Sequence, residues 1–237
     1  IMLELNKIYN QDCMEGLKNI DDCSIDCIVT DPPYRITSRG NCGTAGGMFK
    51  TKLGQNGKLF EHNDIDIYIY ISELYRVLKE DTHCYIMCNN VNLAHFFEAI
   101  TKSDFHFTKL LVWDKQNKIC GTYYMGQIEF IFLLRKGGDR PINNCGTSDL
   151  LSFPNVKDKV GGENIHNSQK PINLFRTMIV NSTNEGDVVL DPFMGSGTTA
   201  LACIKENRKY VGFEIDSKYY DTATTRIKDE SRNLSLF

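Results

Sequence analysis

Residues 188–198 read VVLDPFMGSGT. The run at 188–190 predicts a short buried strand, because it is apolar and β-branched. Gly195 and Gly197 permit a tight turn in which the backbone approaches a ligand closely. The following residues, TTALACI, predict a helix whose first turn carries free N–H groups. A second strand, YVGF at 210–213, completes a βαβ unit.

An acidic residue, Glu214, ends that second strand about 20 residues beyond the glycine turn, which suits a carboxylate that binds ribose hydroxyls. Thr199 and Ala200 stand where a dinucleotide fingerprint has its third glycine, so a pyrophosphate ligand is disfavoured. The unit also lies near the C-terminal end of the chain, where dinucleotide domains seldom begin. S-adenosylmethionine, which has no phosphate but has a charged amino-acid tail, fits better. A Gly-x-Gly pair alone is more often an ordinary turn.

A second predicted strand, the apolar run at 27–30, is also followed by an acidic residue, in the tetrapeptide DPPY at 31–34. Open α/β sheets bind ligands at the carboxyl ends of their strands. We therefore expect this tetrapeptide and the glycine turn to border one crevice.

The tetrapeptide suits an aromatic amine, which is a poor nucleophile because its lone pair is delocalised into the ring. The Asp31 carboxylate and the Pro32 carbonyl can accept its two hydrogens, and the prolines Pro32 and Pro33 fix φ and remove donors. Tyr34 offers a stacking face worth about 1–3 kcal/mol per base. Such a pocket requires a base that is flipped out of the duplex. A proline-rich turn with a solvated Asp31 is the alternative.

With both motifs, the chain resembles the S-adenosylmethionine-dependent amino-DNA methyltransferases of the β motif order, in which DPPY precedes the Phe-x-Gly-x-Gly cofactor loop. It is most similar to the small bacterial and phage N6-adenine enzymes. Further matches lie at 9–13, 110–115, 126–132 and 166–171. The resemblance covers nearly the whole chain. It implies one α/β domain over residues 1–237: a Rossmann-like methyltransferase sheet, mainly parallel with one antiparallel strand at 128–134, and helices on both faces.

The resemblance also implies roles for single residues. Asp12 would contact the cofactor adenine and Glu214 its ribose, while Phe193 would pack beside the cofactor. Lys170 and Thr198 would lie near its methionine end. The expected catalytic residues are Asp31, Pro32, Pro33 and Tyr34, and the expected cofactor-binding residues are Asp12, Cys13, Asp31, Lys170, Asp191, Phe193, Gly195, Ser196, Gly197, Thr198 and Glu214.

The expected reaction is methyl transfer from S-adenosylmethionine to the N6 amine of a flipped-out adenine in double-stranded DNA. Transfer to cytosine N4 stays open, although Asp instead of Ser at position 31 favours adenine. Methylation of RNA or another amine is a further alternative. From a different class, the chain could be a nucleotide-binding module without catalysis.

The formal net charge of −3 argues mildly against a DNA partner, since phosphate contacts call for a basic face. A local excess of basic residues softens this objection. Residues 35–63 contain six glycines and one acid, and we expect a mobile loop that orders over DNA rather than a disordered insertion. The candidate DNA-binding residues of this loop are Arg35, Arg39, Lys50, Lys52 and Lys58. Residues 136–165 are expected to form a short target-recognition insert. A second copy of the chain and a cognate restriction endonuclease are further candidate partners.

Nine cysteines occur without any Cys-x-x-Cys pair or histidine cluster, which favours buried free thiols in a reducing compartment over a metal site. The sequence shows neither a signal peptide nor a membrane-spanning run, so we expect a cytoplasmic protein without membrane contact.

Apolar spacing predicts helices at 66–78, 92–100 and 218–227 and strands at 108–113 and 128–134. Trp113 is expected in the core, and Leu93, Phe96, Phe97 and Ile100 are expected to face inward.

Overall fold

The structure, a computed structural model, describes residues 3–33, 65–119, 123–155, 159–160, 163–164 and 169–234. Its main feature is an eight-stranded sheet with the order β1-β10-β9-β2-β3-β5-β4-β6. β5 is antiparallel to both of its neighbours, and the other pairs are parallel. The predicted sheet with one antiparallel strand is therefore confirmed. The strands are β1 (Lys7–Tyr9), β2 (Ile25–Thr30), β3 (Leu78–Cys88), β4 (His106–Ile119), β5 (Gly126–Lys136), β6 (Leu150–Ser152), β9 (Val188–Asp191) and β10 (Lys209–Phe213), with β7 (Lys159–Val160) and β8 (Glu163–Asn164) forming a separate pair.

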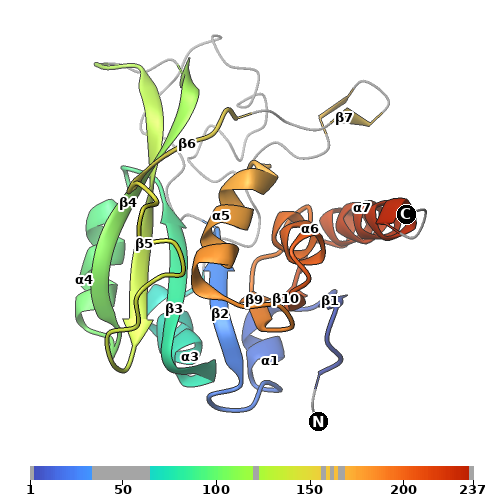
Figure 1. Cartoon of the computed structure of the whole chain (residues 1–237), viewed down its shortest axis with the longest axis horizontal. Coiled ribbons are helices and arrows are strands. Elements are labelled where there is room, and N and C mark those ends of the chain that lie inside the picture. The colour runs from blue at the N-terminus through green and yellow to red at the C-terminus, as the bar shows by residue number, and fades with distance from the viewer. Residues whose placement is uncertain are drawn as a thin grey trace.

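Helices cover both faces of this sheet, as predicted (Figure 1). One face carries α1 (Cys13–Leu17), α3 (Ile67–Val77) and α4 (Leu93–Thr101). The other carries α5 (Ile172–Ser182), α6 (Thr198–Lys205) and α7 (Ser217–Leu234). Within the described ranges, no helix is both long enough and apolar enough to cross a membrane.

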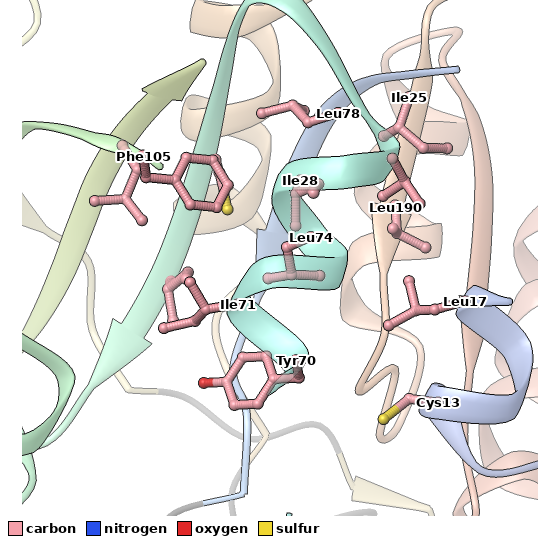
Figure 2. Close-up of a cluster of buried hydrophobic side chains, with 14 of the residues drawn as sticks. Cys13, Leu17, Ile25, Ile28, Tyr70, Ile71, Leu74, Leu78, Phe105 and Leu190 are labelled. Carbon is pink, nitrogen blue, oxygen red and sulfur yellow. The ribbon is translucent and has the colours of Figure 1, made fainter. Parts of the chain in front are cut away.

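Alternating side chains of the strands pack into two hydrophobic cores, one on each face of the sheet. In β2, Ile28 packs with α1 and α3, whereas Cys27 and Val29 pack with α5 and α6. Figure 2 shows the first core, where Tyr70, Ile71 and Leu74 follow one side of α3. This period-2 pattern buries β2 on both faces, as is typical of central strands in parallel sheets.

The predicted helices and strands are all present, with longer bounds for some. β4 continues to Ile119 and α7 to Leu234. Trp113 is buried as expected, and its indole N–H donates to the Phe153 carbonyl at 2.9 Å. The inward orientation expected for Phe97 is wrong: its side chain is 37% exposed and packs at the sheet margin against Phe107.

The described part of the 136–165 segment is mostly without regular secondary structure but packs against the main sheet. It supplies β6, which pairs with β4 as the edge strand of the main sheet. Asn143 ties the preceding loop to α5, because its side-chain amide donates to the Val180 and Thr183 carbonyls at 2.8 and 2.9 Å. Lys136 is buried, and its ammonium donates to the Tyr75 and Leu78 carbonyls. The expected role of residues 136–165 in target recognition stays a prediction.

The sheet reverses its winding between β2 and β9, which are neighbours. From β2 the next strand of the main sheet along the chain, β3, lies on one side, while from β9 the chain continues to β10 on the other. Ligands of open α/β sheets bind at such a switch point, outside the carboxyl ends of the strands. Asp31 follows β2 there and Asp191 ends β9, so the fold brings the two sequence motifs to one place.

Candidate active site

A buried hydrogen-bond network joins the two motifs. The hydroxyl of Thr30, the last residue of β2, donates to Asp191 Oδ1 at 2.7 Å. The Phe193 amide donates to the same oxygen at 3.0 Å, and the Thr199 hydroxyl donates to Asp191 Oδ2. Asp191 is only 3% exposed. These hydrogen bonds give Asp191 a role in holding the glycine turn against β2, and its predicted contact with the cofactor stays a prediction.

Burial raises the pKa of Asp191 to about 6, against the opposing effect of its hydrogen bonds. The folded state therefore holds this proton more tightly than the unfolded state, whose value is near 3.8. The contribution to stability is complete below about pH 4 and is lost as the pH rises through 6. Relative to Asp191→Asn, the wild-type free energy of unfolding should fall by on the order of 3 kcal/mol between pH 4 and pH 7. Denaturant titrations of both proteins measure this difference, and a pH-independent difference would contradict the assignment.

The glycine turn adopts the conformation that the sequence predicts. Gly195 has φ of 53° and Gly197 has φ of 83°, both in the left-handed region that favours glycine. Gly197 is also the N-cap of α6. The side chains of Ser196 and Thr198 are buried beside this turn, and the Ser196 hydroxyl accepts from Arg226 at 3.2 Å. The first turn of α6 thus begins directly at the glycine turn.

Glu214 is fixed across this turn by backbone amides. Gly195 N donates to Glu214 Oε2 at 2.7 Å, and Asp216 N donates to Oε1 at 2.8 Å. Burial raises the pKa of Glu214 above its ordinary value. The Glu214 amide itself donates to the Tyr9 carbonyl at 3.0 Å, which ties it to the end of β1. A half-buried carboxylate with a fixed orientation beside a glycine turn is suited to accepting hydrogen bonds from two adjacent hydroxyls of a sugar.

Aromatic and thiol side chains line the adjoining region. The ring of Phe193 meets the ring of Tyr70 edge-on, with 5.6 Å between centroids. The Tyr70 hydroxyl is buried and has no hydrogen-bond partner among the described residues. Asp12 caps α1, accepting from Met14 N at 2.8 Å. The thiol of Cys13 is buried in the core, and burial raises its pKa to about 12. The predicted contacts of Asp12 and Cys13 with a cofactor stay predictions.

A chain of alternating charges surrounds Asp31. The Lys170 ammonium donates to Asp31 Oδ2 and lies 3.6 Å from Glu129 Oε2. Lys115 in turn donates to Glu129 Oε1 at 3.1 Å. Burial opposes the ionisation of Glu129, but the two ammonium groups outweigh it, so the pKa of Glu129 is lowered. Burial likewise opposes the charge on Lys170, yet the Asp31 and Glu129 carboxylates raise its pKa. These pairings favour the charged forms of Glu129 and Lys170 in a largely buried row of side chains.

The sequence motifs indicate no role for Glu129 or Lys115. The available signal was a glutamate inside the apolar strand 128–134, since a charged residue there demands a partner. Tyr34 and the basic residues Arg35, Arg39, Lys50, Lys52 and Lys58 lie outside the described residues, so their roles stay predictions. Five of the seven described cysteines are buried as expected, Cys23 and Cys145 being exposed. Within the described ranges, no group of His, Cys, Asp and Glu has the arrangement of a metal site.

A mainly parallel sheet, a glycine turn after β9, a carboxylate fixed beside that turn and a second acid across the switch point together have the arrangement of a cofactor-dependent group-transfer enzyme. The family model N6_N4_Mtase, described as DNA methylase, matches residues 25–225, and the chain belongs to this DNA methylase family.

Individual relatives agree with the family. The chain is 30% identical to the type II methyltransferase M.HpaI of Haemophilus parainfluenzae, over 94% of this chain and 74% of that protein. It is 28% identical to the DNA adenine methyltransferase YhdJ of Escherichia coli K12, over 94% of this chain and 83% of that protein. The fold is similar to the crystal structure of the M1.HpyAVI–SAM complex, with a TM-score of 0.67, 24% identity and coverage of 93% of this chain and 98% of that one.

Proposed function

We propose that this DNA methylase transfers a methyl group from S-adenosylmethionine to the N6 amine of a flipped-out adenine in double-stranded DNA. The observation that carries the proposal is the hydrogen bond between Thr30 and Asp191 across the switch point. It places Asp31, which follows Thr30, beside the glycine turn that begins at Asp191. An amine acceptor and a nucleoside site therefore border one crevice.

The residues present fit S-adenosylmethionine. Glu214 presents a fixed carboxylate for the ribose, Phe193 an apolar ring, and the buried Tyr70 hydroxyl is a polar group without a partner among the described residues. When bound, the cofactor would supply an electrophilic methyl group on a positively charged sulfur, and the sulfur would keep the C–S electron pair as a neutral thioether.

Asp31 has two tasks in this account. Its carboxylate accepts a hydrogen bond from the amine, which orients the nitrogen lone pair toward the methyl group, and orientation of this kind removes a large part of a barrier. After transfer the nitrogen carries a positive charge and one surplus proton, which passes to Asp31 or through it to solvent. The ion pair with Lys170 holds the Asp31 carboxylate in place. The Pro32 carbonyl is the second acceptor in this proposal.

Adenine is favoured over cytosine by Asp at position 31 and by the adenine specificity stated in the name of YhdJ. The family name includes both N6 and N4 enzymes, so transfer to cytosine N4 is the second candidate. The type II relatives support a cognate restriction endonuclease as a partner, and a homodimer stays a prediction.

Transfer of a tritium-labelled methyl group from S-adenosylmethionine to unmethylated DNA tests this function. We expect label in the DNA with the wild-type chain and background label with Asp31→Ala. Label in RNA but not in DNA, or binding of the cofactor without any transfer, would overturn the proposal.

A DNA contact is also supported within the described residues. β3 ends at Cys88, opposite Phe130 of β5, so the β4–β5 hairpin continues about 13 Å beyond this edge at ~3.3 Å per residue. Figure 1 shows the hairpin rising past the neighbouring strands. Near its tip, Tyr123 and Tyr124 are 95% and 93% exposed. Exposed rings above a base-flipping crevice can stack on unpaired bases, and we propose this as their role.

Replacing Tyr123 and Tyr124 together by alanine should raise the KM for DNA by roughly 10-fold or more, because each stacked base is worth about 1–3 kcal/mol. Cofactor affinity should not change. Steady-state kinetics on duplex DNA provide the measurement. The double Tyr→Phe variant keeps the rings and should resemble wild type, as should Leu5→Ala, an exposed apolar residue just before β1. A KM for DNA that stays at the wild-type value in the alanine variant would exclude the contact.

A further inference from the structure

The charged side chains of Lys115, which is buried, and Glu129, which is half-buried, adjoin Lys170 but have no direct part in the proposed transfer. Glu129 is on β5 opposite Trp113 of β4, one residue beyond the last β3 pairing, so it faces the same edge as Asp31. Lys115 is two residues beyond Trp113, on the same face of β4 as the tryptophan, and its ammonium lies 5.9 Å from the centre of that ring. Both charges are therefore carried by paired strands, which are rigid supports.

A contribution to stability does not by itself explain the ion pair between Glu129 and Lys115. Replacing buried ion pairs with apolar residues is often neutral or stabilising, whereas removing one partner leaves an uncompensated charge. Glu129 contacts two lysines, through Oε1 to Lys115 at 3.1 Å and through Oε2 to Lys170 at 3.6 Å. Oε2 makes no hydrogen bond within the described residues. Its partner is thus the ammonium of Lys170, the same ammonium that binds Asp31.

The location of Lys170 explains why a second carboxylate is useful. Lys170 lies in the segment before α5, not on a strand, and its long side chain has several rotamers to lose. A single carboxylate partner leaves the ammonium free to pivot around Asp31. Two carboxylates on opposite sides, one after β2 and one on β5, hold it between them. Lys115 balances the charge of Glu129, so that the row is neutral as a whole.

We propose that Glu129, supported by Lys115, is a positioning residue for methyl transfer: it holds the Lys170 ammonium against Asp31 and thereby orients the carboxylate that receives the amine. The inference rests on the proposed function of Asp31. With Glu129 and Lys115 included, the proposed site extends from Asp31 across β5 to β4.

The test compares Glu129→Gln, Lys115→Met and the double variant as full chains. For each variant, three quantities are measured: the single-turnover transfer rate at saturating cofactor and DNA, the cofactor Kd by calorimetry, and the Tm. We expect Glu129→Gln to slow transfer by about 10- to 100-fold, as loss of a supporting residue commonly does, with the cofactor Kd within about threefold of wild type. The double variant removes both charges, so its Tm should recover while its transfer rate stays low. If Glu129→Gln alone does not fold, the transfer rate of the double variant is compared with that of wild type instead.

Glu80→Gln is the matched control, because Glu80 lies 3.6 Å from the buried ammonium of Lys136 at the other end of the β3–β5 pair. It should transfer at the wild-type rate. Recovery of both Tm and rate in the double variant would show a merely structural pair and overturn the inference. So would Glu129→Gln transferring within about threefold of wild type. Inactivity of the wild-type chain on DNA would instead refute the proposed function.

Discussion

Replacing Asp31 by alanine should reduce methyl transfer by roughly 10²- to 10⁴-fold, the range for loss of a group that handles charge and protons at the reacting atom. Cofactor affinity should stay close to the wild-type value, because the glycine turn follows β9, Glu214 follows β10, and both keep their own hydrogen bonds. Single-turnover assays give the rate, and calorimetry gives the affinity. Asp31→Asn should also fail, since an amide cannot take the proton.

Asp26 provides the control for Asp31. Asp26 lies on β2, the strand that Asp31 follows; it pairs with Lys79 at 2.6 Å and accepts from Val188 N at 3.0 Å. Asp26→Asn removes an ion-paired carboxylate from β2 away from the crevice, so it should lower Tm without slowing transfer. Transfer at the wild-type rate by Asp31→Ala would show that another group accepts the amine.

Replacing Glu214 by alanine should weaken cofactor binding before it affects the rate at saturation. Two hydrogen bonds from sugar hydroxyls to a carboxylate are worth about 2–3 kcal/mol together, which corresponds to roughly 30- to 150-fold in Kd. Calorimetric titration with S-adenosylmethionine measures this change.

The same variant also loses the hydrogen bond from Gly195 N, so its Tm without ligand must be compared with that of wild type. Asp216→Asn changes the neighbouring acid, which accepts from Lys218 N and Tyr219 N at the start of α7. This control should bind the cofactor normally. If Glu214→Ala also binds normally, Glu214 does not contact the ribose.

The sequence predicts well those parts of the site that depend on local patterns. The apolar runs before Asp31 and Asp191 predict strands, and parallel packing then brings their carboxyl ends together. Gly195 and Gly197 predict the turn because few other residues adopt its positive φ. In these cases a short segment contains both the structural signal and the chemical group.

The rest of the site depends on pairing between distant segments. The partnership of Glu129 with Lys115 follows from the register of β4 against β5, and the contact of Lys170 with Asp31 joins residues from the two halves of the chain. Neither is visible in spacing along the sequence. The resemblance placed Lys170 near the cofactor's methionine end, and the structure adds its ion pair with Asp31. The burial of Asp191 and its bonds to Thr30 and Thr199 likewise became apparent only from the packed strands.

The most direct test of the central claim is mass spectrometry of nucleosides from DNA that the purified chain has methylated with S-adenosylmethionine. We predict N6-methyladenine with the wild-type chain and none with Asp31→Ala. N4-methylcytosine instead would contradict the choice of adenine, and the absence of any methylated base with a cofactor-binding protein would contradict the proposed function as a whole.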